Sequence, residues 1–217
     1  GEALLARTEA ILASGATMLQ YRDKHGKARQ DAEALKNLCH KYNIPFIVND
    51  DVALALALDA DGVHVGQEDT AAASARAQLG PDKIVGVTAK NHEQAKKAVS
   101  DGAEYLGVGA LFPSVSNDSS LTSRDTLKAI CASVDIPVNE NTAAILAGTG
   151  VSGAAVISAL YSLPQPQLAT KRLARKLDYI VNGDAHIAGI LADVDGTLTD
   201  TLAFYQDLVP GFLRDNG

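Results

Sequence analysis

One repeated pattern constrains the fold of this chain more than any other feature. A short run rich in apolar and β-branched residues ends in polar residues, and an alanine-rich stretch with helical spacing follows it. The strand-like runs cover residues 17–21, 45–49, 62–65, 83–87, 105–108 and 154–157. Short strands that alternate with helices predict βαβ units and a parallel sheet.

The number of these units indicates the kind of parallel sheet. Six or seven units without a glycine-rich nucleotide fingerprint favour a TIM-type (β/α)8 barrel over a doubly wound sheet. In such a barrel the carboxyl ends of all strands open on the same face. We therefore expect the polar residues that follow separate strands to meet at one mouth.

Composition excludes several classes of function. The 217 residues carry a formal net charge of −7, which argues against non-specific binding to nucleic acid or to an anionic membrane surface. No apolar run approaches the length of a transmembrane helix. Cys39 and Cys131 match no metal or redox spacing, so we expect reduced thiols in a cytoplasmic protein.

The residue composition of the chain changes after Leu160. A proline- and glutamine-rich stretch at 162–167 is typical of a boundary, and the apolar run at 187–192 is typical of a buried strand. We expect a barrel over residues 1–161, a linker over 162–178 and a partial second domain over 179–217.

Basic and amide side chains follow the first strand at alternate positions. Gln20, Arg22 and Lys24 would share one side if the strand continues that far. An arginine fork beside a lysine suits a phosphate or pyrophosphate, although a solvated charge cluster at a strand end gives the same pattern.

Acidic residues follow the next two strands. Asp50 and Asp69 could bind Mg²⁺, which takes one or two carboxylates together with substrate phosphate oxygens. The competing interpretation is helix capping, which accounts for Asp51 and Thr70.

Other polar positions have weaker signals. Thr88 could contact a substrate or cap the next helix. His64 lies on a strand and is expected in the core, or behind a residue that contacts ligand, rather than as a metal ligand. The polar loop at 112–120, with Ser114 and Ser116, could form a lid that binds a second phosphate or an ordinary surface loop.

Taken together, five segments resemble the thiamine phosphate synthase family over residues 3–161. They are residues 15–24, 45–51, 61–69, 105–114 and 156–159. The resemblance implies a (β/α)8 barrel, a transferase that joins aminopyrimidine-methyl pyrophosphate to thiazole-ethyl phosphate, and Mg²⁺ as cofactor. It also implies small-molecule phosphates and pyrophosphates as partners, and leaves self-association of the chain open.

The resemblance assigns roles by position. It implies that Gln20, Arg22, Lys24 and Asn49 hold the pyrimidine pyrophosphate, that Asp50 and Asp69 bind Mg²⁺, and that Thr88 lies near the pyrimidine. Ser114, Ser116, Ile157 and Ser158 would contact the thiazole phosphate. Pyrophosphate leaves more easily when positive charge neutralises it, so catalysis would rest on positioning and electrostatics.

Three departures from the family pattern stand out, and the two at whole strands lead us to expect an incomplete barrel. The strand that precedes the helix beginning near Glu2 is missing, and Asn117 stands where the family has a lysine. Residues 135–141 lack a glycine pair and most of the seventh strand. An open parallel edge would expose unpaired backbone groups.

A second motif follows the apolar run at 187–192. The segment 193–201 resembles the first motif of haloacid-dehalogenase-type phosphatases, in which the residues at Asp193 and Asp195 are the nucleophile and the acid/base. Only 20 residues follow Thr197, so we expect an inactive fragment of a Rossmann-like phosphatase domain. The function hypotheses are a synthase fused to this fragment, a phosphatase, and a barrel that resembles a thiazole tautomerase or only binds ligand.

Overall fold

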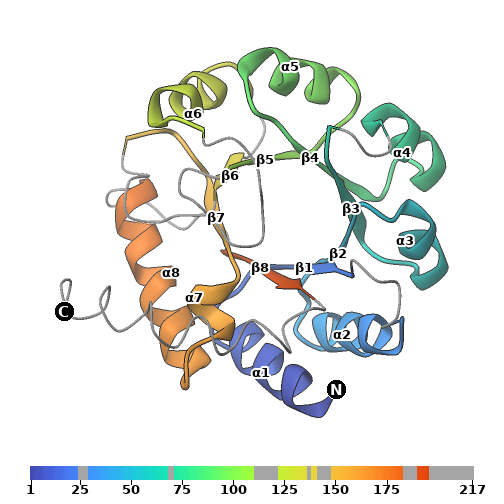
Figure 1. Cartoon of the computed structure of the whole chain (residues 1–217), viewed down its shortest axis with the longest axis vertical. Coiled ribbons are helices and arrows are strands. Elements are labelled where there is room, and N and C mark those ends of the chain that lie inside the picture. Colours follow the sequence, from blue (N-terminus) through green and yellow to red (C-terminus); the bar gives the residue numbers. More distant parts are fainter. Residues whose placement is uncertain are drawn as a thin grey trace.

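A computed structural model of the chain describes residues 1–23, 29–67, 71–109, 122–135, 138–140, 148–182 and 190–195. Within them, eight parallel strands form a closed barrel in sequence order, and helices surround it (Figure 1). The strands are β1 (Met18–Arg22), β2 (Phe46–Asn49), β3 (Gly62–Val65), β4 (Ile84–Thr88), β5 (Tyr105–Val108), β6 (Val138–Glu140), β7 (Gly153–Val156) and β8 (Ile190–Asp195). The predicted parallel sheet and its six sequence-predicted strands are confirmed.

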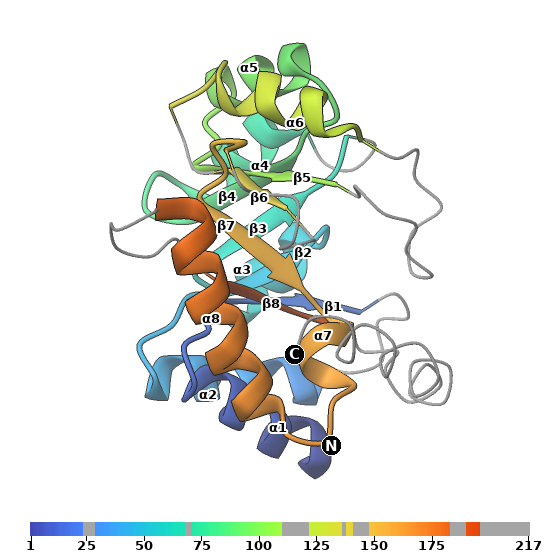
Figure 2. The ribbon, with the colours of Figure 1, turned by 90° about the vertical axis from the view of Figure 1, so that its left-hand side faces the viewer.

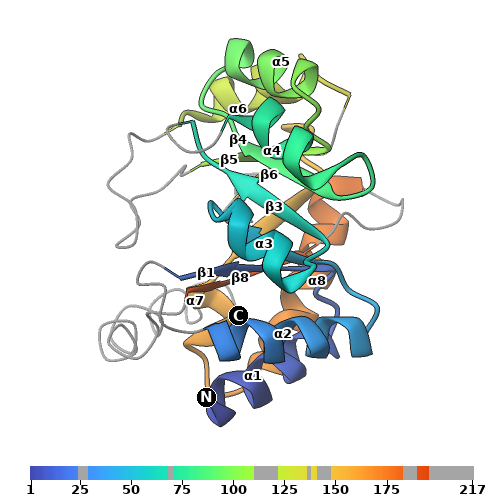
Figure 3. The ribbon, with the colours of Figure 1, turned by 90° about the vertical axis from the view of Figure 1, so that its right-hand side faces the viewer.

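Helices follow most of the strands and cover the outside of the sheet (Figures 2 and 3). They are α1 (Glu2–Leu12), α2 (Arg29–Lys41), α3 (Val52–Leu58), α4 (Ala72–Leu79), α5 (His92–Ser100), α6 (Arg124–Cys131), α7 (Ser158–Tyr161) and α8 (Pro166–Asn182). Asp51, Asn91 and Ser123 accept hydrogen bonds from the first turns of α3, α5 and α6, which fixes where these helices begin. Among the described residues no helix is both long enough and apolar enough to span a bilayer.

Alternate residues of each strand face in opposite directions, which separates the core from the interior of the barrel. The fully buried Leu19, Val63, Val85 and Leu106 pack with the helices in one hydrophobic cluster. Burial of each such side chain contributes about 1.5–3 kcal/mol. The positions between them carry Gln20, His64 and other polar residues, so the apolar alternation turns polar groups toward the barrel interior.

Closure of the barrel corrects the expectation that the sheet is open where the family's first strand is missing. β8 lies between β7 and β1, with Ala192 opposite both Val156 and Leu19. The strand that was predicted to open a Rossmann-like phosphatase fragment therefore completes the barrel sheet, and the structure does not support that fragment. Figure 3 shows β8 beside β1.

The expected gap at β6 is also closed. β6 has only three residues, yet it pairs with β5 through Leu106 and with β7 through Gly153. Three paired residues suffice because a barrel strand needs a neighbour on each side rather than a fixed length.

Most of the range predicted as a linker is helix α8. Pro166 begins this helix, where its missing N–H costs nothing, and Thr170 donates a hydrogen bond to the Pro166 carbonyl oxygen at 2.8 Å. Leu177 is fully buried, and α8 packs along α1 and α7 (Figure 2). The domain boundaries at 161 and 178 stay a prediction.

Candidate active site

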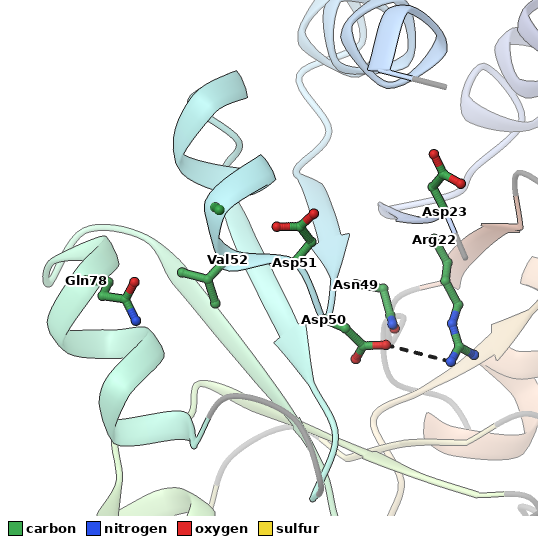
Figure 4. Close-up of a pocket in the computed structure, with 8 residues that line it drawn as sticks. Arg22, Asp23, Asn49, Asp50, Asp51, Val52 and Gln78 are labelled. Atoms are coloured by element: carbon green, nitrogen blue, oxygen red, sulfur yellow. Dashed lines mark ion pairs between the residues drawn. The ribbon is translucent and has the colours of Figure 1, made fainter. Parts of the chain in front are cut away.

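Arg22 and Asp50 meet at the carboxyl ends of two neighbouring strands. Arg22 ends β1, Asp50 follows β2, and Arg22 Nη2 lies 3.7 Å from Asp50 Oδ2. The pair lines an open pocket of about 570 Å³, with Asn49 beside it (Figure 4). Each of the two charged side chains is about one-third exposed. A cation and an anion at the same strand ends could bind a metal–diphosphate complex.

The two neighbouring aspartates have different tasks. Asp51 Oδ1 accepts a hydrogen bond from Leu54 N at 2.8 Å, so the capping interpretation is confirmed for Asp51. Asp50 has the left-handed φ of +65°, and its N–H donates to the His64 carbonyl oxygen at 2.7 Å. A non-glycine residue in this region is uncommon and is often found at functional sites. In Figure 4 Asp50 points toward Arg22, while Asp51 points away.

An amide pair lies next to these charges. Gln20 Nε2 donates a hydrogen bond to Asn49 Oδ1 at 2.5 Å, and Gln20 is buried. Because this bond uses the Asn49 oxygen, the Asn49 Nδ2 group turns to the other side. An amide donor held in this way could bind a phosphate oxygen or a ring nitrogen.

Thr88 is connected to the barrel interior. His64 Nε2 lies 2.9 Å from Thr88 Oγ1, and Gln67 Nε2 donates to the Thr88 carbonyl oxygen at 2.5 Å. Asn91, rather than Thr88, caps α5. The capping alternative is therefore wrong for Thr88, and its hydroxyl belongs to the polar network of the mouth.

The sequence analysis missed Tyr105, and it left open whether His64 lies in the core or supports a residue of the site. Tyr105 OH lies 3.0 Å from His64 Nδ1, and both side chains are buried. A sequence signal did exist, because Gly86 and Gly107 lie on neighbouring strands at positions where the two rings need space.

The structure describes only some of the other residues that the sequence predicts for the site. Ile157 follows β7, and its carbonyl oxygen accepts hydrogen bonds from the first turn of α7. Ser158 begins α7. In the register of β8 and β1, Asp193 lies opposite Gln20 and Asp195 lies opposite Arg22. The side chains of Ser158, Asp193 and Asp195 lie outside the described part of the structure. Lys24, Asp69, Ser114, Ser116 and Asn117 lie outside the described residues.

Oxygen donors dominate the pocket. Asp23, Asn49 and Asp50 line it, together with Asp51, whose carboxylate is used by the cap of α3, and carboxylate and amide oxygens are the ligands that Mg²⁺ prefers. The described residues contain no group of three or more His, Cys, Asp or Glu arranged to hold a metal. This donor set fits an ion held mainly by one carboxylate and by ligand phosphate oxygens.

Neither cysteine takes part in this site. Burial raises the pKa of the Cys39 thiol to about 12 and that of Cys131 to about 11. Both thiols are free and stay protonated near neutral pH, so they are poor nucleophiles.

Comparison with known proteins gives a consistent result. Residues 1–160 match the family model described as thiamine monophosphate synthase. The chain is 39% identical to a thiamine-phosphate synthase of Methanobrevibacter smithii, over 81% of this chain and 88% of that protein. It is 43% identical to one of Coprothermobacter proteolyticus, over 80% of this chain and 87% of that protein. A solved thiamine phosphate pyrophosphorylase from Pyrococcus furiosus superposes with a TM-score of 0.74 at 33% identity, covering 82% of this chain and 91% of that one.

Proposed function

The chain belongs to the thiamine monophosphate synthase family, and we propose that its barrel mouth joins aminopyrimidine-methyl pyrophosphate to thiazole-ethyl phosphate. The products would be thiamine phosphate and pyrophosphate. The observation that carries this proposal is the meeting of Arg22, Asn49 and Asp50 in one pocket at the carboxyl ends of β1 and β2. Chemistry in a parallel barrel takes place at this end.

Each described residue has a task in the proposed reaction. Arg22 would neutralise charge on the departing pyrophosphate, and the Gln20–Asn49 amide pair would hold the pyrimidine half-substrate. Thr88 would contact the pyrimidine ring. The remaining substrate contacts, at Lys24, Ser114, Ser116, Ile157 and Ser158, are proposed from the family resemblance alone.

Mg²⁺ would be held by Asp50 and Asp69 together with pyrophosphate oxygens. When bound, the ion would supply positive charge to the leaving group. The carboxylate of Asp50 supports this assignment because it is not used as a helix cap, unlike that of Asp51. Arg22 lies close enough to Asp50 for the two to bind one metal–pyrophosphate complex, Arg22 through the phosphate oxygens and Asp50 through the metal.

The test compares two neighbouring substitutions. Asp50→Asn keeps a residue that tolerates the left-handed φ but removes the carboxylate charge. Asp51→Asn keeps the cap of α3 and serves as the matched control. Pyrophosphate release should need both half-substrates and Mg²⁺. Loss of one charge-assisted contact, worth about 1.5–3 kcal/mol, should lower release by roughly 10- to 150-fold in Asp50→Asn only.

Three results would contradict the proposal. Release from one half-substrate alone would exclude the joining reaction, and absence of release would favour a tautomerase-like or binding barrel. Equal activity of Asp50→Asn and the parent chain would remove the metal role. The phosphatase hypothesis for Asp193 and Asp195 stays a prediction that no contact of the described residues favours.

A further inference from the structure

A series of hydrogen bonds between three side chains leads from the barrel interior to the mouth. It begins at Tyr105 on β5, passes through both ring nitrogens of His64 on β3, and ends at the hydroxyl of Thr88 on β4. The two distances are 3.0 and 2.9 Å. Tyr105 and His64 are 4% and 7% exposed, so the bond between them is shielded from water, while the bond to Thr88 is part-buried at the mouth.

Two glycines of the barrel leave space for the rings of His64 and Tyr105. A Cβ at Gly107 would lie 2.9 Å from His64 Cε1, and a Cβ at Gly86 would overlap the Tyr105 ring. The register places His64 opposite Gly86 and Gly86 opposite Tyr105, so the two rings share one level of the barrel. Their centroids are 5.4 Å apart. Each ring is therefore held by backbone on one side and by the other ring on the other.

The imidazole of His64 determines which group donates and which accepts in each of the two hydrogen bonds. A neutral imidazole has one donor and one acceptor nitrogen, so one hydroxyl must donate to His64 and the other must accept from it. A phenol is a stronger acid than an aliphatic alcohol, so Tyr105 O–H is the better donor to Nδ1. Nε2–H then donates to Thr88 Oγ1. In this arrangement the hydroxyl hydrogen of Thr88 is left to donate to a group other than His64.

We propose that His64 is a positioning residue that, held by Tyr105, aims the Thr88 hydroxyl as a donor toward a ring nitrogen of the pyrimidine half-substrate. This inference rests on the proposed synthase function. Aminopyrimidine ring nitrogens accept hydrogen bonds, and Thr88 lies at the carboxyl end of β4, where the mouth opens. The Gln67 bond to the Thr88 carbonyl oxygen fixes the backbone beneath this hydroxyl.

Two substitutions of His64 separate positioning from a structural role. The amide of glutamine reaches the place of Nε2, so His64→Gln keeps the bond to Thr88 and gives up the bond to Tyr105. The shorter amide of asparagine reaches the place of Nδ1, so His64→Asn keeps Tyr105 and gives up Thr88. Both variants lose the buried ring, so we expect similar decreases in thermal midpoint.

The experiment measures kcat and the KM of each half-substrate for the full-length chain. Thr88→Val should raise the KM for aminopyrimidine-methyl pyrophosphate about tenfold, as expected for one lost hydrogen bond. His64→Asn should raise it to a similar degree, and the double variant should be no worse than either single one, because both remove the same contact. His64→Gln should stay within about threefold of the parent chain. The KM for thiazole-ethyl phosphate should not change in any variant.

Equal KM values for His64→Gln and His64→Asn would overturn the inference, as would a double variant whose effect is the product of the two single effects. If the parent chain releases no pyrophosphate, the proposed function fails instead. Calorimetric titration with aminopyrimidine-methyl pyrophosphate then still ranks the variants by affinity. An unchanged affinity in His64→Asn would contradict the positioning role independently of turnover.

Discussion

The charges at the mouth contribute little to the stability of the fold. Arg22 and Asp50 are 3.7 Å apart and each about one-third exposed, and such pairs typically stabilise a protein by less than about 1 kcal/mol. The same residues line the open pocket at the carboxyl ends of β1 and β2. The stability of the fold therefore does not account for their placement, whereas the proposed binding of pyrophosphate would.

Because Arg22 lines the pocket but contributes little to stability, Arg22→Gln should affect ligand binding more than folding. The free energy of unfolding should change by less than about 1 kcal/mol, because the lost pair is solvated. The KM for aminopyrimidine-methyl pyrophosphate should rise on the order of tenfold or more, because a charge-assisted contact is lost. Urea unfolding and steady-state kinetics measure the two effects. Arg22→Lys, which keeps the charge but not the planar fork, should give an intermediate KM. A large loss of stability with unchanged kinetics would contradict the assignment.

At the scale of single elements, short helices depend on their first residues. α3 has seven residues, and Val52, Ala55 and Leu58 pack its inner face against the sheet. Asp51 supplies the cap, and left-handed Asp59 ends the helix. Asp50 is therefore followed directly by a helix whose start is fixed, which keeps its carboxylate near Arg22.

Asp51→Ala should lower the free energy of unfolding by about 0.5–2 kcal/mol, because one N–H of the first turn loses its acceptor. Asp51→Asn, which can still accept that bond, should lie within a few tenths of a kcal/mol of the parent chain, on the order expected for equivalent caps. Urea denaturation of both variants measures the difference. Equal stability of the alanine and asparagine variants would show that the Leu54 contact does not hold α3.

The elements that could be predicted from the sequence are those whose pattern is local. Runs such as 62–65 alternate apolar and polar positions and end in the expected polar residues, and Arg22 and Asp50 meet as predicted. The Tyr105–His64 contact was not predicted, because it depends on space that Gly86 leaves for Tyr105 and Gly107 leaves for His64, in each case from a different strand of the barrel. Pro166 was misinterpreted because proline marks the start of a helix as readily as a linker.

At the scale of the whole molecule, the sequence-based prediction failed most clearly for β8, which was expected in a separate domain and lies in the barrel sheet. Strands buried on both faces are nearly continuous apolar runs in barrels and in doubly wound sheets alike. The run that ends in Asp193 and Asp195 therefore predicts a buried parallel strand but not its neighbours. In the structure β1 and β7 provide those neighbours, and the barrel has no open edge among its described strands.

Closure by β8 can be tested at Ala192, which lies opposite Leu19 and Val156. Ala192→Pro removes an N–H and fixes φ in a central strand, so unfolding should become easier by at least about 2–3 kcal/mol. Ala192→Gly keeps the N–H and should cost no more than about 1 kcal/mol. With β8 displaced, β1 becomes a sheet edge, and those amides of β1 that bond to β8 should exchange hydrogen much faster in the proline variant alone, unlike the Leu19 amide, which bonds to the Pro45 carbonyl oxygen. If their exchange is the same in both variants, residues 190–195 do not complete the barrel, and the separate C-terminal domain predicted from the sequence is the better description.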